Sequence, residues 1–406
     1  MFPNNSSDHQ SRNPFQSFWA AGYECADHIN AHGDRVDLLA ATGHNQMLEE
    51  DYAALRPFNI RTVREGIRWN SVEKRAYQYD WRGPEAILKA AQVAGVQVLW
   101  DICHFGFPDD CSPLHPKFSQ RFAALCAAFV RWYRDHVPDG PLVITPINEA
   151  SFLSWLCAEV GGAAPYAVRM GWDAKYHLMR AYIAGIEAMR EVDPGVRILT
   201  TEPLMNLVPH IDATPAEVDH AARVHDVQFQ ALDMLCGRIC PELGGTMANL
   251  DILGFNYYYN NQWIVGDTFL PWVNDNEDPR WRPLRSLFAE AWSRYQRPMA
   301  LTETSHAGEH RPQWIRFVAE ECAAAISAGI PLWGVCLYPI IDRPDWDNLS
   351  YWHHSGLWDA NELVGPYGRV LCEPYAEALL EAQRMVSQAQ KGLTTAFRSH
   401  IGVLAG

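Results

Sequence analysis

Eight apolar runs alternate with stretches of helical periodicity, and this alternation restricts the chain to very few folds. Most of the runs are almost continuously apolar, as expected for parallel strands that are covered on both faces. Eight such strands over 406 residues predict an α/β fold, a single (β/α)8 TIM barrel with loop insertions at its C-terminal face. The runs are residues 17–24, 60–67, 96–104, 142–149, 196–203, 250–258, 298–305 and 332–339.

The segments between these runs have apolar residues spaced as on one face of a helix. We expect one catalytic domain over residues 1–406, with residues 1–15 as a flexible N-terminal extension. A doubly wound open sheet is the alternative, but no Gly-x-Gly-x-x-Gly motif follows the first run. The predicted helices lie at residues 84–94, 121–134, 170–192, 217–239, 311–328 and 373–390.

The charge and cysteine content exclude several classes of partner. A net charge of −15 argues against nucleic acid and against an anionic membrane surface. No apolar run is long enough to span a bilayer, and the N-terminus lacks the pattern of a secretory signal. The ten cysteines have no framework spacing, which is typical of reduced thiols in a cytoplasmic protein.

Polar residues stand where the predicted strands end. In (β/α)8 barrels the C-terminal ends of the strands carry the chemistry, so these side chains are expected to meet at one rim. They are Glu24, Arg64, Glu65, His104, Asn148, Glu149, Glu202, Asn256, Tyr258, Glu303 and Tyr338.

Two of these residues, Glu149 and Glu303, come from the fourth and seventh strands. A pair of carboxyl groups facing each other across one cleft suggests glycoside hydrolysis, in which one group donates a proton and the other stays ionised. Arg64 is a candidate to keep one of them charged, and Asn148 to hold a sugar hydroxyl. For either glutamate alone, a salt bridge at the rim is the simpler interpretation.

With these residues identified, the chain resembles glycoside hydrolase family 1, the β-glucosidase family, from about residue 16 to residue 385. "TPINEA" is similar to the family's Thr-Phe-Asn-Glu-Pro, which makes Glu149 the implied acid/base. "LTETS" is similar to Ile-Thr-Glu-Asn-Gly, which makes Glu303 the implied nucleophile. "REGIRW", "HFGFP", "LGFNYYY" and "LYPIIDRPDW" match further motifs of the family in the same order.

The resemblance implies roles for other residues as well. Arg64 would lie beside the nucleophile, and Tyr258 would be its hydrogen-bond partner. Tyr338 would form the aromatic floor. The implied sugar-binding residues are Asp27, His104, Asn148, Asn256, Asp345 and Trp346.

Several sugar-contacting positions depart from the family pattern. Asp27 stands where the family has Gln, Phe105 and Tyr338 each replace Trp, and Asp345 is one methylene shorter than the usual Glu. Because such groups select particular hydroxyls, we expect retained glycosidase chemistry with non-standard sugar specificity.

The predicted function is therefore a retaining β-glycoside hydrolase that acts on the terminal sugar of a small carbohydrate substrate. No cofactor and no metal are expected. A transglycosidase using the same glycosyl-enzyme, or a catalytically silent glycan-binding barrel, are the alternatives. Glu202, His353 and His354 also lie near the predicted mouth without an assigned role.

Overall fold

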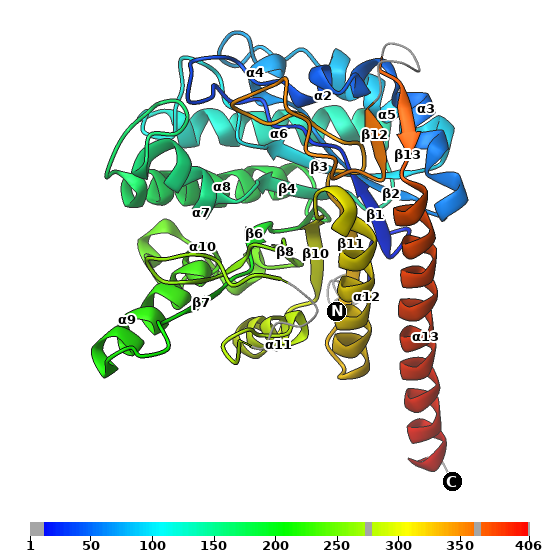
Figure 1. Ribbon diagram of the computed structural model, residues 1–406. Helices are drawn as coiled ribbons and strands as arrows, with labels where there is room; N and C mark the ends of the chain where they lie inside the picture. Colours follow the sequence, from blue (N-terminus) through cyan, green and yellow to red (C-terminus); the bar gives the residue numbers. More distant parts are fainter. Residues whose placement is uncertain (1–11, 273–277, 361–366, 405–406) are drawn as a thin grey trace.

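A closed ring of parallel strands forms the centre of the computed structural model, which describes residues 12–272, 278–360 and 367–404 (Figure 1). The hydrogen-bonded order is β5-β4-β3-β2-β1-β11-β10-β8-β6, and every pair in it is parallel. β5 and β6 stand at the two ends of this order but both come from the fifth predicted run. A parallel bridge joins Leu199, directly after β5, to Ile252, directly before β8, so the fifth run closes the barrel.

All eight predicted runs contain a strand of this ring. The bounds are β1 Trp19–Gly22, β2 Thr62–Gly66, β3 Gln97–Cys103, β4 Val143–Ile147, β5 Arg197–Ile198, β6 Glu202–Pro203, β8 Leu253–Asn256, β10 Met299–Thr304 and β11 Leu332–Leu337. Two small sheets outside the barrel were not predicted: β7 Asn206–Val208 with β9 Gln262–Ile264, and β12 Trp358–Ala360 with β13 Arg369–Leu371.

Helices surround the ring on its outer side (Figure 1). The longer ones are α5 Arg82–Ala94, α6 Phe118–His136, α8 Gly171–Val192, α9 Pro215–Asp226, α11 Leu284–Tyr295, α12 Arg311–Ser327 and α13 Glu373–Leu404. The shorter ones are α2 Leu38–Ala41, α3 Leu48–Ala54, α4 Trp69–Val72, α7 Ala150–Ser154 and α10 Gln230–Leu235. The red helix α13 continues well past the body of the barrel.

The strands bury both faces, which explains why they are almost continuously apolar. Outward-facing residues such as Val63 and Trp100 belong to the large core between the strands and the helices. Inward-facing residues such as Leu99 and Val143 form a separate small cluster, and Phe15 packs against it. Because side chains alternate along a strand, the inward face of β3 carries Leu99 and, two residues later, Asp101.

The structure differs from the sequence analysis at three places. The helix predicted at 217–239 is broken into α9 and α10 by a 3-10 turn at Val227–Phe229. The helix α11 was not predicted. Residues 1–11 of the predicted N-terminal extension lie outside the described residues, whereas the Asn13 side chain donates to the Trp333 carbonyl at 3.1 Å, which ties this part to the barrel.

Two further observations concern the chain as a whole. Each of the ten cysteines is unpaired. Among the described residues, no helix combines the length and the apolar character that crossing a bilayer requires.

Candidate active site

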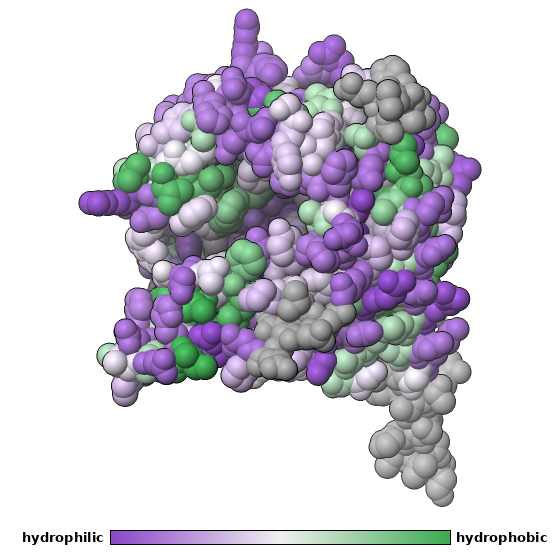
Figure 2. Space-filling view, viewed as in Figure 1, coloured by the Kyte–Doolittle hydropathy of each residue, from purple (hydrophilic) through white to green (hydrophobic). Residues whose placement is uncertain are grey.

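A cavity of about 540 Å³ opens where the barrel strands end. The space-filling view shows the surface hollowed near the middle of this face (Figure 2). The ionisable residues in its wall are Glu24, His104, Glu149, Tyr258, Tyr259, Glu303, His306, Tyr338, Arg343, Asp345, Asp347 and His353. The cavity therefore brings together polar groups from strands that are far apart in the sequence.

Glu303 on β10 is held by two strong donors. Arg64 Nη1 donates to its Oε1 at 2.7 Å, and the Tyr258 hydroxyl donates to its Oε2 at 2.8 Å. Both contacts favour a negatively charged carboxylate. The side chain lies in the cavity wall and is almost completely buried, and the two donors fix its position.

Arg64 on β2 links Glu303 to the rest of the site. It is fully buried, and it donates to Asp101 at 3.1 Å and to the Asn148 side-chain oxygen at 2.7 Å. Burial disfavours the guanidinium charge, but Asp101 and Glu303 outweigh this effect and raise the pKa of Arg64 further above its ordinary value. One cation therefore lies between two carboxylates and remains charged.

Glu149 lies in the same cavity but in different surroundings. It follows β4 at the start of α7 with a φ of 43°, in the left-handed region, which turns the chain sharply at the mouth. Its Oε1 accepts one hydrogen bond, from the Asn256 amide at 2.8 Å. Burial of the carboxyl and then the negative charge of Glu303 raise the pKa of Glu149 well above its ordinary value. This carboxyl is therefore suited to carry a proton.

Asn148 and Asn256 support the two glutamates from behind the cavity wall. Both are fully buried and neither belongs to the cavity lining. Asn148 accepts from Arg64, whereas Asn256 donates to Glu149 and accepts from the Thr302 hydroxyl at 2.7 Å. In this structure the two amides position other site residues.

His104 and Tyr338 form the floor of the cavity. The Tyr338 hydroxyl lies 3.1 Å from His104 Nε2, and the two rings stack with centroids 5.7 Å apart. Gly22 at the end of β1 makes room for this floor, because a Cβ there would lie 2.1 Å from the Tyr338 ring. Although burial opposes its charge, Cys25, Asp101 and Glu24 raise the pKa of His104 well above its ordinary value.

Asp345 and Trp346 lie in the loop after β11 and line the opposite wall. Asp345 Oδ1 accepts the backbone N–H groups of Asp347 and Asn348, and its Oδ2 lies 3.2 Å from His353 Nε2. The ring of Trp346 has its centroid 5.0 Å from that of Phe105.

Asp27 is the one predicted sugar-binding residue that neither lines the cavity nor forms a side-chain hydrogen bond with the residues around it. It is not part of the cavity lining, and it is 1% exposed. Neither carboxylate oxygen has a hydrogen-bond partner among the described residues. The carboxyl packs against Gly106, where a Cβ would lie 1.8 Å from Asp27 Oδ1. Burial raises the pKa of Asp27 to about 7.

The sequence analysis assigned no role to three polar residues of the site, Asp101, Glu24 and Arg343. Asp101 pairs with Arg64 at 2.7 Å and contacts His104 at 2.9 Å, and the signal for it was a charged residue inside a buried strand run. Glu24 was noted only as a strand end. Its carboxylate lies 3.4 Å from both His104 and Arg343. Although burial opposes its charge, His104 and Arg343 lower the pKa of Glu24 to about 2.

Among the described residues, two clusters have ligand atoms close enough together for a metal ion. One consists of Cys25, Asp101 and His104, but Asp101 is already shared between Arg64 and His104. The other consists of Asp342, His354 and Asp359, where Arg311 already forms an ion pair with Asp359 at 2.7 Å. The neighbouring arginine in each cluster occupies an oxygen that a metal would need.

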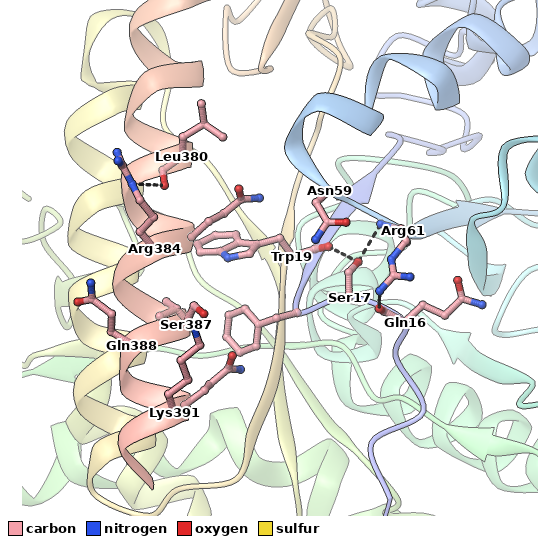
Figure 3. A pocket seen from close by; sticks show the side chains of 14 residues that line it. Gln16, Ser17, Trp19, Asn59, Arg61, Leu380, Arg384, Ser387, Gln388 and Lys391 are labelled. Atoms are coloured by element: carbon pink, nitrogen blue, oxygen red, sulfur yellow. Dashed lines mark hydrogen bonds between the residues drawn. The ribbon is translucent and has the colours of Figure 1, made fainter. Parts of the chain in front are cut away.

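A larger cavity of about 780 Å³ lies at the other end of β1, between the strands and α13 (Figure 3). Its lining includes no Asp, Glu, His or Cys. The Ser17 hydroxyl donates to the Trp19 carbonyl at 2.7 Å, and Arg61 Nη2 donates to the Gln16 carbonyl at 3.1 Å. These polar side chains form hydrogen bonds with backbone carbonyl groups. Because the lining has no carboxyl, imidazole or thiol group, this cavity has no acid/base pair.

Comparison with known proteins identifies solved structures that share this fold. No family model matches the chain, and no curated protein matches its sequence. A β-glucosidase from Thermotoga maritima in complex with glucoimidazole matches with a TM-score of 0.74 at 14% identity, over 91% of this chain and 99% of that chain. A family 1 β-glucosidase from the same organism matches with a TM-score of 0.71 at 13% identity, over 93% and 99%.

The AHE enzyme from Alicyclobacillus herbarius is also similar. It matches with a TM-score of 0.68 at 16% identity, over 85% of this chain and 87% of that chain. The chain thus has the barrel fold of the family 1 β-glucosidases, as the sequence motifs predicted.

Proposed function

We propose that this chain is a retaining β-glycoside hydrolase. The observation that carries the proposal is that two glutamates line one cavity with opposite support: Glu303 is held by a cation and a hydroxyl, and Glu149 by a single amide. A nucleophile must be ionised and a general acid must be protonated, and these are the states that the two sets of contacts favour. The similarity of the fold to family 1 β-glucosidases supports the same reaction class.

In the first step, a Glu303 oxygen attacks the anomeric carbon of the terminal sugar. The bond from that carbon to the leaving oxygen breaks, and the proton of Glu149 moves to the leaving oxygen. The products of this step are a free alcohol and a glycosyl ester on Glu303. Arg64 and Tyr258 hold the attacking carboxylate in place and release it as its charge is consumed.

In the second step, Glu149 is a carboxylate and takes a proton from a water molecule. The water oxygen attacks the anomeric carbon from the face that the leaving group has vacated, and the ester bond to Glu303 breaks. Both glutamates return to their starting states, and the sugar leaves with the configuration of the substrate.

The part of the cavity that would bind the sugar has an unusual set of polar groups. Glu24 and Arg343 form a loose ion pair at 3.4 Å in the wall, and His353 supports Asp345 on the other side. A sugar held there exchanges hydrogen bonds with both acidic and basic side chains. This set supports a specificity different from that for a plain glucoside.

The test is covalent labelling with 2,4-dinitrophenyl 2-deoxy-2-fluoro-β-glycosides that differ in the sugar. Such compounds form the glycosyl ester quickly and lose it slowly, so the proposal predicts one added sugar on the peptide that contains Glu303. The E303Q variant should remain unlabelled, and a variant with the exposed Glu320 replaced, E320Q, should label like the wild type. Labelling of another residue, or no labelling by any sugar in the series, would contradict the proposal.

A further inference from the structure

Glu202 is a buried carboxyl group that takes no part in the proposed reaction. It lies on β6, in the fifth barrel run, and it is 3% exposed and does not line the candidate active site. Lys175 on α8 is the cation that acts on it, but Lys175 Nζ donates to the Gln230 side-chain oxygen at 3.0 Å. Burial of a carboxyl group costs free energy, so a role for Glu202 is expected.

The segment that carries Glu202 holds Glu149 from two sides. The Thr201 carbonyl accepts the Glu149 N–H at 2.8 Å. On the other side, β6 pairs with β8, the strand that ends at Asn256 (Figure 1). The Leu204 N–H donates to the Asn256 carbonyl at 2.9 Å, and the Asn256 side chain is the amide that donates to Glu149. The segment therefore connects the backbone of Glu149 to the donor of its carboxyl group.

Glu202 itself holds the residues that follow Glu149. Its Oε2 accepts the N–H of Ser151, the second residue of α7, at 3.3 Å. Glu149 lies just before this helix in the left-handed region, a conformation that a residue with a side chain adopts only where its neighbours enforce it. The hydrogen bonds to Thr201 and Glu202 fix the backbone on both sides of this turn. They therefore set the direction of the Glu149 side chain.

The charges around the two carboxyl groups differ in sign. Burial is the largest cause of the raised pKa of Glu149, and the charges of Glu303 and Glu202 raise it further. Burial, offset in part by Ser151 and Lys175, raises the pKa of Glu202 to about 6. The other titratable groups that act on this pair are His104, Tyr258 and, from α8, Tyr182. Above about pH 6, Glu202 is thus a second negative charge beside Glu149.

We propose that Glu202 is the positioning residue of the general acid: it holds the turn at Glu149 and places a second negative charge behind that carboxyl group. A nearby like charge disfavours loss of the proton, so Glu149 remains an acid to a higher pH than Glu303 alone would allow. In the second step the same charge makes the Glu149 carboxylate a stronger base. The inference rests on the proposed glycosidase function, which assigns the acid/base role to Glu149.

The first test compares the pH dependence of kcat/KM in the wild type and in E202Q. Glutamine keeps an oxygen that can accept the Ser151 N–H but carries no charge, so the basic limb of the profile should move to lower pH by at least about half a unit. At about pH 5, where the Glu202 carboxyl is already protonated, the two proteins should differ by less than about twofold. An unchanged basic limb in E202Q, or an equal loss at every pH, would overturn the proposal.

Two further variants separate the hydrogen bond from the charge. E202A removes both, so it should show the same shift of the basic limb and, in addition, a loss of kcat at about pH 5. The control variant E217Q changes an exposed carboxylate that accepts the Thr214 N–H at 2.7 Å, and it should keep the wild-type profile. A shift in E217Q as large as that in E202Q would show that the effect is not specific to Glu202.

The second test does not depend on hydrolysis. Infrared spectra of wild type minus E149Q, and of E202Q minus E202Q/E149Q, give the pH at which the protonated band of Glu149 disappears. We expect a lower midpoint in the E202Q pair, by the same amount as the shift of the basic limb. If the midpoint moves but no glycoside is cleaved, the proposed function fails and the positioning role stands. If glycosides are cleaved but the two midpoints agree, the positioning role is excluded and the proposed function stands.

Discussion

The surroundings of Glu303 and Glu149 differ although both carboxyl groups border one cavity. Glu303 receives hydrogen bonds from a buried guanidinium and from a tyrosine hydroxyl, whereas Glu149 receives one from an amide. The negative charge of Glu303 is itself one cause of the raised pKa of Glu149. Direct hydrogen bonds thus favour the ionised form of Glu303. The charge on Glu303 in turn favours the protonated form of Glu149.

Asp27 extends the comparison to a buried carboxyl that has no hydrogen-bond partner among the described residues. Burial is the largest cause of its shift and raises the pKa of Asp27 to about 7. The carboxyl groups of Glu303, Glu149 and Asp27 thus form a series with two, one and no hydrogen-bond donors from side chains. The following predictions test each member of that series.

Replacing Glu303 by glutamine should have the largest effect. The amide keeps the shape of the side chain but cannot form the glycosyl ester, so kcat/KM should fall by about 10⁵-fold. Steady-state kinetics with an aryl glycoside measures the loss, and circular dichroism checks that the fold remains. Near-normal turnover in E303Q, with E320Q also unchanged, would remove Glu303 from the chemistry.

Replacing Glu149 by glutamine should have the next largest effect. Loss of a general acid costs about 10²- to 10⁴-fold, and substrates with poor leaving groups should suffer most. Added azide should restore turnover of a 2,4-dinitrophenyl glycoside, because the anion replaces the activated water in the second step. The product should then be a glycosyl azide of β configuration. Equal losses for good and poor leaving groups would exclude the acid role.

Replacing Asp27 by asparagine should change how stability depends on pH. A pKa raised to about 7 means that the folded state holds a proton that the unfolded state loses near pH 4. Wild-type stability should therefore fall, relative to D27N, as pH rises from about 4 to about 7. The difference is on the order of 4 kcal/mol, because a shift from 3.8 to about 7 corresponds to about 1.4 kcal/mol for each pKa unit.

Chemical denaturation at several pH values measures this dependence. The control variant D34N changes an exposed aspartate in the same loop and should behave like the wild type. The same D27N protein also tests the sugar-binding role suggested by the sequence. A KM raised tenfold or more would show that Asp27 reaches the sugar despite its place behind the wall.

Replacing Tyr258 by phenylalanine should have the smallest effect. One hydrogen bond to a carboxylate contributes about 1.5 to 3 kcal/mol, so kcat should fall by roughly 10- to 100-fold. The matched control is Y176F, which removes a tyrosine–glutamate hydrogen bond on the outer helix α8. A loss in Y176F as large as that in Y258F would show that the effect is one of stability.

The sequence predicted much of the fold because hydrophobic periodicity is a local property. Each apolar run contains a barrel strand, and the helix predicted at 170–192 is observed as α8, Gly171–Val192. The two small outer sheets were missed because their strands have only three residues, too few to show a period. The break between α9 and α10 was missed because the apolar spacing continues across it.

The candidate site was predictable to the extent that strand ends define it. Glu149 and Glu303 line the cavity because their strands end there, and Arg64 on β2 contacts Glu303 from behind the lining. Asp27 lies beyond the end of β1, and its carboxyl packs against Gly106 instead of lining the cavity. No local sequence pattern predicts this packing. Asp101 was hidden inside an apolar run.

The central claim is that one cavity holds a neutral Glu149 beside an ionised Glu303. Infrared difference spectra of wild type minus each glutamine variant test it directly, because the carboxyl groups outside the cavity cancel. At a pH where the enzyme is active, the difference for E149Q should contain the band of a protonated carboxyl, and the difference for E303Q should contain the bands of a carboxylate. Raising the pH through the pKa of Glu149 should remove the first band and the activity together. A protonated band that belongs to Glu303, or a carboxylate at Glu149 while the enzyme is active, would contradict the account.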